Sequence, residues 1–139
     1  MARPIPTPND LTKPFWEAAN QKKLVVQKCD TCGKLQYPPA LICGSCRADK
    51  DKLQWKEVEG KGHVDVGFTI RDSRIKGYRE MQPINFCVIT LDEEPLLNFL
   101  SNLPGTPAGT IPVGAAVELI FEPVSPTQLL PEWRVVAAN

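Results

Sequence analysis

The sequence predicts a mainly β protein that combines one N-terminal helix, a cysteine-rich module and a five-stranded barrel. Three observations lead to this fold class. The 14 prolines among 139 residues disfavour a helical bundle. Several short segments after residue 52 alternate between apolar and polar residues or are apolar throughout, as strands are. Four cysteines stand as two close pairs in the first third of the chain. We expect three parts: an arm and helix over residues 1–23, the cysteine module over 24–52 and the barrel over 53–139.

The composition limits the classes of function. Lys plus Arg and Asp plus Glu both total 16, so the formal net charge is zero. Nucleic-acid-binding proteins usually carry a basic excess, because phosphate contacts drive their affinity. No run approaches the roughly 20 apolar residues that span a bilayer, and the proline-rich start lacks the apolar core of a signal peptide. We therefore expect a cytoplasmic protein whose thiols stay reduced.

The first 23 residues predict an extended arm followed by a helix. The alternating prolines Pro4, Pro6 and Pro8 favour an extended backbone, which is either a disordered tail or an arm that lies over a partner subunit. Residues 12–23 then predict a short helix with an apolar stripe, and Thr12 is its expected cap.

Five strands are expected after the cysteine module. Residues 63–71 alternate cleanly, which indicates a half-buried strand, and residues 84–91 are apolar on both faces, which indicates a central strand. Five short strands with one long connection over 92–112 fit a small Greek-key barrel of the oligonucleotide/oligosaccharide-binding (OB) type. The other three strands are expected over 53–59, 115–122 and 133–136. In the strand expected over residues 63–71, the apolar side chains that should share one buried side are Val64, Val66, Phe68 and Ile70.

The four paired cysteines are spaced as ligands of one metal ion. Cys29 and Cys32 form one C-x-x-C pair, and Cys43 and Cys46 form a second pair after ten intervening residues. Each pair lets two thiolates converge from one tight turn, so two pairs supply the four sulfurs of a tetrahedral zinc site. Four protein ligands leave no open position for water or substrate, so we expect a structural zinc ion that folds the module.

Small and basic residues around the pairs suit the same site. Gly33 follows the first pair and Gly44 lies within the second, and glycine permits turns whose N–H groups point at the sulfurs. Lys28, Lys34 and Arg47 can offset part of the negative charge of four thiolates. Iron in a rubredoxin-like site is the alternative, because the same thiolates accept it.

The chain offers no convincing catalytic set. His63 is the one histidine, and it is expected on the polar face of a strand. The sequence has neither a G-x-S-x-G motif nor a glycine-rich phosphate loop. Cys87 lies mid-strand between apolar residues, where a packed thiol is the expected role.

Two segments are candidates for contact with a ligand or a partner. Residues 71–82 combine basic side chains with one aromatic ring, which either hold phosphates and stack on a base or form an ordinary solvated hairpin. Residues 95–104 are too apolar for an ordinary surface loop, so they either cap the barrel or contact a partner. The candidate residues are Arg71, Arg74, Lys76, Tyr78, Arg79, Leu96 and Phe99.

Together, these motifs resemble a known family of zinc-ribbon plus OB-fold proteins. The run FWEAANQKKLVVQKCDTCGKLQYPP, the following CGSC pair, a tryptophan and a G-x-G-x-V strand carry the resemblance. The later runs PINFCVITLDE, IPVGAAVELIFEPV and LPEWRVV extend it to nearly all of residues 11–137. The family was first catalogued as a domain of unknown function and is associated with acyl-CoA metabolism.

The resemblance implies a function that the residues alone do not show. Family members act as small subunits of thiolases, acetyltransferases or retro-aldolases, beside a thiolase-like or lipid-transfer-protein-like catalytic subunit. The chain is therefore expected to be a zinc-binding accessory subunit without catalysis of its own, in a complex whose ligand is a coenzyme A thioester. The alternatives from the residues are a single-stranded nucleic-acid-binding OB module, which the zero net charge disfavours, and an iron electron carrier.

Overall fold

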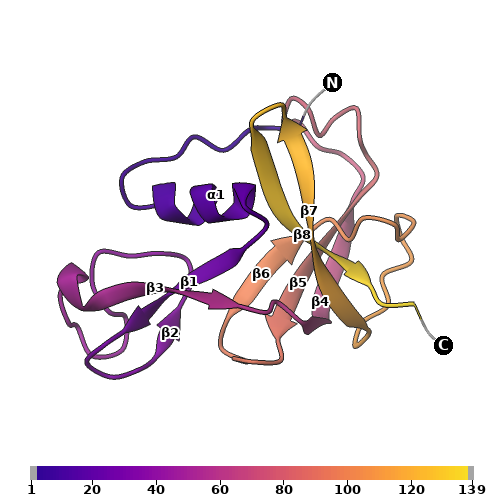
Figure 1. Cartoon of the computed structure of the whole chain (residues 1–139). Helices are drawn as coiled ribbons and strands as arrows, with labels where there is room; N and C mark the ends of the chain where they lie inside the picture. Colours follow the sequence, from indigo (N-terminus) through magenta and orange to yellow (C-terminus); the bar gives the residue numbers. More distant parts are fainter. Residues whose placement is uncertain (1–2, 138–139) are drawn as a thin grey trace.

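The computed structural model describes residues 3–137, which fold as one α-helix followed by two antiparallel β sheets (Figure 1). The first sheet has strand order β2-β1-β3 and the second has order β6-β5-β4-β7-β8, which confirms the predicted mainly β class. Within these residues, no helix reaches the length and hydropathy of a membrane-spanning segment. The elements are α1 (Lys13–Asn20), β1 (Leu24–Cys29), β2 (Leu35–Gln36), a 3₁₀ turn (Lys50–Lys52), β3 (Leu53–Val58), β4 (Gly62–Ile70), β5 (Ile84–Leu91), β6 (Asn98–Ser101), β7 (Ala116–Ser125) and β8 (Gln128–Val135).

Helix α1 is shorter than the expected 12–23, and the Thr12 side chain does not cap it. Thr12 holds the N-cap position, but its Oγ1 accepts a hydrogen bond from the Asn9 N–H at 3.0 Å. The Asn9 Oδ1 accepts one from the Thr12 N–H in return, at 2.9 Å. Lys22 has φ 58, so the chain leaves the helix through a left-handed residue and turns into β1. Phe15 lies on the buried face of α1.

The five strands of the barrel are not the five expected from the sequence. Residues 53–59 correspond to β3, which pairs with β1 along its whole length and so belongs to the ribbon sheet. The fifth barrel strand is β6, which lies inside the expected long connection over 92–112. Alternation within a strand does not identify its partner, because pairing depends on contacts far along the chain. The ribbon sheet therefore continues to Val58, past the expected start of the barrel.

The barrel is brought together by contacts between its edge strands, β6 and β8. The Ser101 Oγ accepts a hydrogen bond from the Trp133 N–H at 3.0 Å and donates one to Glu132 Oε2 at 2.7 Å. Trp133 is completely buried, and its Nε1–H donates to the Gly60 carbonyl oxygen at 2.7 Å. Around this tryptophan the barrel core consists of Val64, Cys87, Ile89, Leu91, Leu97, Phe99, Leu103 and Val117.

A bulge in β4 overturns the expectation that its apolar residues share one buried face. The pairing of β4 with β5 shifts between Val64 and Val66, so the residues after the bulge change sides. Val64 is fully buried, whereas Val66 and Phe68 are 53% and 59% exposed. Gly67 takes the inward position, where a Cβ would lie 3.0 Å from the Cys87 sulfur. Two apolar side chains of β4 therefore face solvent.

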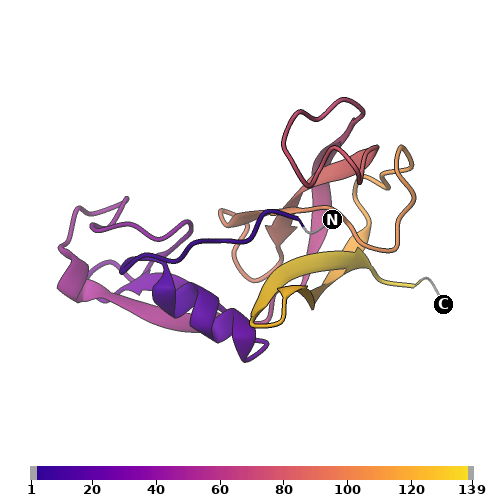
Figure 2. The same cartoon turned by 90° about the horizontal axis from the view of Figure 1, so that it is seen from above.

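The N-terminal arm lies against the chain's own barrel (Figure 2). The Arg3 guanidinium pairs with the Glu132 carboxylate at 3.0 Å and with the Glu122 carboxylate at 3.5 Å, and it donates to Asn102 Oδ1 at 3.4 Å. Glu132 is 5% exposed, and burial raises its pKa although the Ser101 hydroxyl, the Asn102 N–H and Arg3 each oppose that shift. The arm thus supplies the cation for a buried carboxylate.

Candidate metal centre

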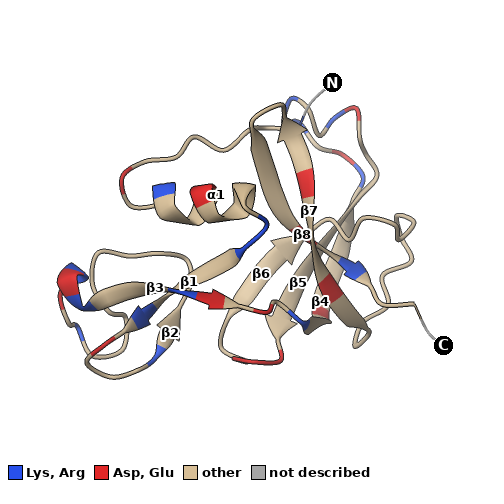
Figure 3. Cartoon of the chain, viewed as in Figure 1, with Lys and Arg blue, Asp and Glu red and all other residues tan. Residues whose placement is uncertain are grey.

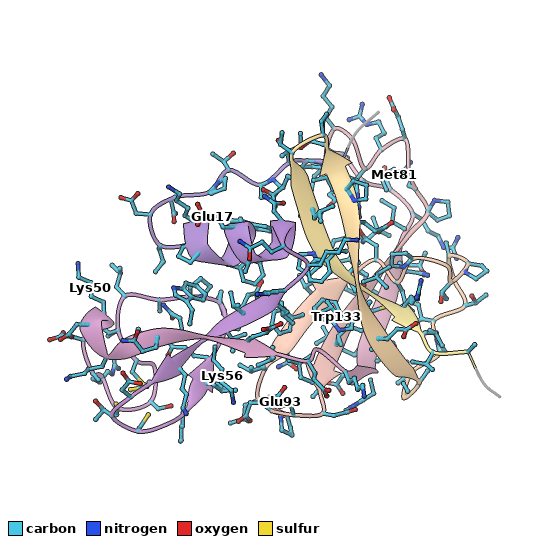
Figure 4. All side chains as sticks on the ribbon, in the orientation of Figure 1. Glu17, Lys50, Lys56, Met81, Glu93 and Trp133 are labelled. Carbon is cyan, nitrogen blue, oxygen red and sulfur yellow. The ribbon has the colours of Figure 1, made fainter. Side chains whose placement is uncertain are left out.

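The four paired cysteines converge at one end of the ribbon sheet, where Figure 4 shows sulfur atoms close together near the labelled Lys50. All four Sγ atoms lie within 4.8 Å of one another. The Cys29–Cys46 pair of sulfurs is 3.6 Å apart and the Cys32–Cys43 pair is 3.7 Å apart. Four Zn–S bonds of about 2.3 Å in a tetrahedron place sulfurs roughly 3.8 Å apart. The quartet therefore fits a tetrahedral zinc ion.

The two turns that carry the cysteines have the same backbone pattern. In the first, the Gly33 N–H donates to the Cys29 carbonyl oxygen at 2.7 Å, and Gly33 has φ 77. In the second, the Arg47 N–H donates to the Cys43 carbonyl oxygen at 3.0 Å, and Arg47 has φ 68. The left-handed residue of the second turn is therefore Arg47, and Gly44, which the sequence suggested for this purpose, does not have a positive φ.

Backbone N–H groups favour the thiolate form of two ligands. The Cys46 and Ser45 N–H groups each lie 3.4 Å from the Cys43 sulfur and lower the pKa of this thiol to about 6. The Cys32 N–H lowers the pKa of Cys29 in the same way, against the effect of burial. At Cys46 the Ala48 N–H favours the thiolate, but burial and the neighbouring cysteines raise the pKa to about 11. A metal cation bound among the sulfurs would favour the thiolate form of its ligands.

Two glutamines hold the second cysteine turn against the ribbon sheet. Neither was predicted from the sequence to be part of the site. Gln27 is 5% exposed, and its Oε1 accepts hydrogen bonds from the Ala40 N–H at 2.8 Å and from Gln36 Nε2 at 2.7 Å. The Gln36 Oε1 in turn accepts the Gly44 N–H at 2.9 Å. The sequence signal for Gln27 was weak: it is a glutamine that directly follows three apolar residues of β1.

The four cysteines of the metal centre differ in burial, because Cys32 and Cys46 are exposed. Cys29 and Cys43 are buried and pack with Leu53 and Ala48 in a small cluster of their own. Four thiolate ligands complete the coordination of zinc, so a substrate or water has no position on the metal. Bound zinc would hold the two turns together and would not take part in a reaction.

The remaining potentially reactive groups lie apart from the metal and from each other. His63 Nδ1 is 3.3 Å from Asp92 Oδ1 at the surface, and the His63 side chain is 43% exposed. Cys87 is fully buried in the barrel core, and burial raises the pKa of its thiol. The packed role expected for Cys87 agrees with this position.

The basic segment 71–82 forms the loop between β4 and β5, and most of its charged side chains are exposed. The Tyr78 ring meets Phe86 of β5 edge-on, with centroids 6.3 Å apart, and does not stand free for stacking. Lys76 and Arg79 line a surface cavity of about 300 Å³. Arg71 and Arg74 are exposed at other points of the loop and do not line this cavity.

The apolar segment 95–104 divides between the core and the surface because β6 runs through it. Phe99 is 3% exposed and Leu97 is 2% exposed, so both fill the barrel. Leu96 and Leu100 point outward and are 78% and 62% exposed. Leu97 and Phe99 are therefore placed to cap the barrel. Leu96 and Leu100 face outward, where they could contact a partner.

An aromatic cleft of about 470 Å³ lies where α1, the ribbon and the barrel meet. The ring of Tyr37 lies 5.5 Å from Phe15 and 4.1 Å from Phe99, and Phe99 lies 5.2 Å from Trp133, measured between centroids. These rings connect the helix and the ribbon to the barrel core. The ribbon, which carries the two cysteine turns, is therefore packed against the barrel through these rings.

Comparisons with known protein sequences agree with this architecture. Residues 16–51 match the family described as "ChsH2, rubredoxin-like zinc ribbon domain". A "Probable enoyl-CoA hydratase alpha subunit" of Thermomonospora curvata is 30% identical over 132 residues, which are 95% of this chain and 40% of that protein. A "DUF35 domain-containing scaffold protein" of Methanothermobacter thermautotrophicus is 26% identical over 110 residues, which are 78% of this chain and 80% of that protein. The chain thus spans less than half the length of the first relative and most of the second.

A solved structure extends the similarity to nearly the whole chain. A chain of the structure described as "Ltp2-ChsH2(DUF35) aldolase" superposes with a TM-score of 0.81 at 26% identity. The match covers 94% of this chain and 98% of that one. The chain is therefore a zinc-ribbon protein whose residues 16–51 match the ChsH2-type rubredoxin-like zinc ribbon and which is similar over most of its length to DUF35 proteins.

Proposed function

We propose that this chain is a non-catalytic accessory subunit of a thiolase- or aldolase-type enzyme complex that acts on acyl-CoA thioesters. The observation that carries the proposal is the superposition, over 94% of this chain, on a chain of an aldolase whose name joins Ltp2 and ChsH2(DUF35). The names of the two sequence relatives, an alpha subunit and a scaffold protein, support a role beside other subunits.

The chemistry of the chain supports the same proposal. Its metal ligands form a closed set, its single histidine pairs with Asp92 at the surface, and Cys87 is buried in the core. The thiolase-like or lipid-transfer-protein-like partner would carry the nucleophile or the acid and base groups, while this chain stabilises it. Four zinc thiolates need a reducing compartment, so the proposal includes a cytoplasmic location.

Reconstitution with a thiolase-like or lipid-transfer-protein-like candidate partner from the same organism tests the proposal. We expect the two proteins to co-purify, and we expect thioester turnover from the pair, far less from the partner alone and none from this chain alone. Size-exclusion chromatography with light scattering measures the complex, and release or consumption of coenzyme A measures turnover. Turnover by this chain in isolation would contradict the proposal, as would a partner that neither binds the chain nor depends on it.

The proposal includes contact between the basic loop 71–82 and the coenzyme A part of the substrate. We expect Arg74→Ala combined with Arg79→Ala to raise the KM of the complex for its thioester roughly tenfold, because charge-assisted hydrogen bonds to phosphate contribute about 1.5–3 kcal/mol each and exposed ones contribute less. Lys50→Ala with Lys52→Ala, an exposed basic pair beside the ribbon, is the matched control. Equal KM values for both double variants would leave the loop as a solvated hairpin.

A further inference from the structure

The outer side of the barrel carries a continuous apolar surface across three strands. Pairing places Val66 of β4 beside Val88 of β5, and Val88 beside Leu100 of β6. The next row consists of Phe68 and Phe86, whose rings are stacked with centroids 6.0 Å apart. We call these five residues the apolar face.

Much of the apolar face is exposed to solvent. Val66, Phe68 and Leu100 are 53%, 59% and 62% exposed, and Phe86 and Val88 are half-buried. Single apolar residues on a surface are ordinary, but contiguous apolar surface marks a site of interaction. The bulge at Val64 and Val66 creates this face, because it turns the apolar residues of β4 outward.

Charged groups of opposite sign lie at the two ends of the apolar face (Figure 3). The loop 71–82, at the end of β4, carries four basic and two acidic residues, and its Tyr78 packs on Phe86. The turn after β5 carries the consecutive acids Asp92, Glu93 and Glu94. Within the chain Glu93 lies 3.9 Å from the Lys56 ammonium and Asp92 lies 3.3 Å from His63 Nδ1, and these groups are partly exposed. A partner with an apolar centre and basic groups opposite the acidic turn would complement this face.

We infer that the apolar face binds the catalytic subunit of the complex, through a surface with an apolar centre and basic residues opposite 92–94. This inference rests on the proposed function. A second copy of this chain, packed face to face, would set the basic loop of one copy against the acidic turn of the other. That arrangement would neutralise the cations that the proposed function assigns to the phosphates of the thioester. With the catalytic subunit on the face, the loop lies at the edge of the interface and stays open to the substrate.

Replacement of two exposed residues of the face tests the inference in the full chain with its catalytic partner. We expect Phe68→Asp with Leu100→Asp to weaken the complex by about 100-fold or more, because central apolar contacts dominate the affinity of interfaces. Titration by sedimentation velocity measures the affinity, and metal content and thermal unfolding show whether the variant retains its fold. Phe68→Thr with Leu100→Thr introduces uncharged β-branched side chains, which suit a strand, and we expect a smaller loss in the same direction. The control is Leu41→Asp with Val113→Asp, two residues 62% and 66% exposed and outside the face, for which we expect affinity like that of the wild type.

The outcomes separate this inference from the proposed function. A folded Phe68→Asp, Leu100→Asp variant that binds the catalytic subunit as tightly as the wild type overturns the inference and leaves the proposed function standing. A wild-type chain that forms no complex overturns both. A third outcome is that the wild-type chain forms a dimer, whereas the aspartate variant is monomeric and still binds the catalytic subunit. That outcome assigns the face to a second copy of this chain and overturns the inference.

Discussion

Replacement of Cys43 by serine is expected to abolish tight zinc binding and unfold the ribbon. Cys43 is 1% exposed, and its sulfur lies 3.7 Å from that of Cys32, so serine leaves three thiolates and a weak hydroxyl ligand in a closed site. Structural zinc ions supply about 10–16 kcal/mol of apparent binding free energy in zinc-finger peptides. That amount is comparable to the stability of a whole domain, about 5–15 kcal/mol. The turns around the metal have only a small apolar cluster to replace it.

The fifth cysteine provides a matched control for this experiment. Cys87→Ser changes the same atom in the barrel core, far along the chain from the quartet, and we expect the variant to keep about one zinc per chain. Metal analysis after dialysis against a mild chelator measures zinc, and hydrogen exchange of the ribbon amides measures its folding. Cys32→Ser should behave like Cys43→Ser. Full zinc occupancy in the two ligand variants would disprove the assignment.

Replacement of Arg3 by alanine is expected to destabilise the chain by about 3 kcal/mol at neutral pH. Removal of one partner of a buried ion pair costs about 3–5 kcal/mol, and the Arg3 side chain keeps 12% exposure, so the lower end applies. Burial already raises the pKa of Glu132, and loss of the cation raises it further. A carboxyl whose pKa is higher in the folded state contributes stability that is present at low pH and lost as the pH rises through that folded pKa. The defect should therefore shrink on acidification.

Urea unfolding of the wild type and Arg3→Ala at pH 8 and pH 5.5, with zinc in excess, measures this dependence. Lys13→Ala is the control, because it removes an exposed pair with Glu17 at 3.8 Å in which both side chains are more than 60% exposed. Exposed pairs contribute about 0–1 kcal/mol. If the Arg3→Ala defect is no larger than that of Lys13→Ala, or grows at the lower pH, the arm does not neutralise Glu132.

The metal ligands were predictable from the sequence because their geometry is local. A C-x-x-C pair spans one turn, so spacing alone brings Cys29 near Cys32 and Cys43 near Cys46. The support of the turns was less predictable. Arg47 takes a left-handed conformation without being glycine, and Gln27 becomes part of the site only because β1 brings it beside residues 36–40.

The outer face of the barrel could not be predicted, because it depends on a one-residue bulge and on long-range pairing. An alternating segment such as 63–71 fits a single buried face, and only its pairing with β5 reveals the shift after Val64. The same limit explains why β3 was expected in the barrel and β6 was not. The Arg3–Glu132 pair joins residues 129 positions apart, so no local pattern indicates it.

The central claim is that four sulfurs close the coordination of one structural zinc ion in a chain that has no reaction centre at its metal. X-ray absorption at the zinc edge of the purified chain tests this claim most directly. We predict a first shell of four sulfurs at about 2.3 Å with no nitrogen or oxygen neighbour. A shell with fewer than four sulfurs and a light-atom ligand would contradict the claim, because it would reveal a position open to water or substrate.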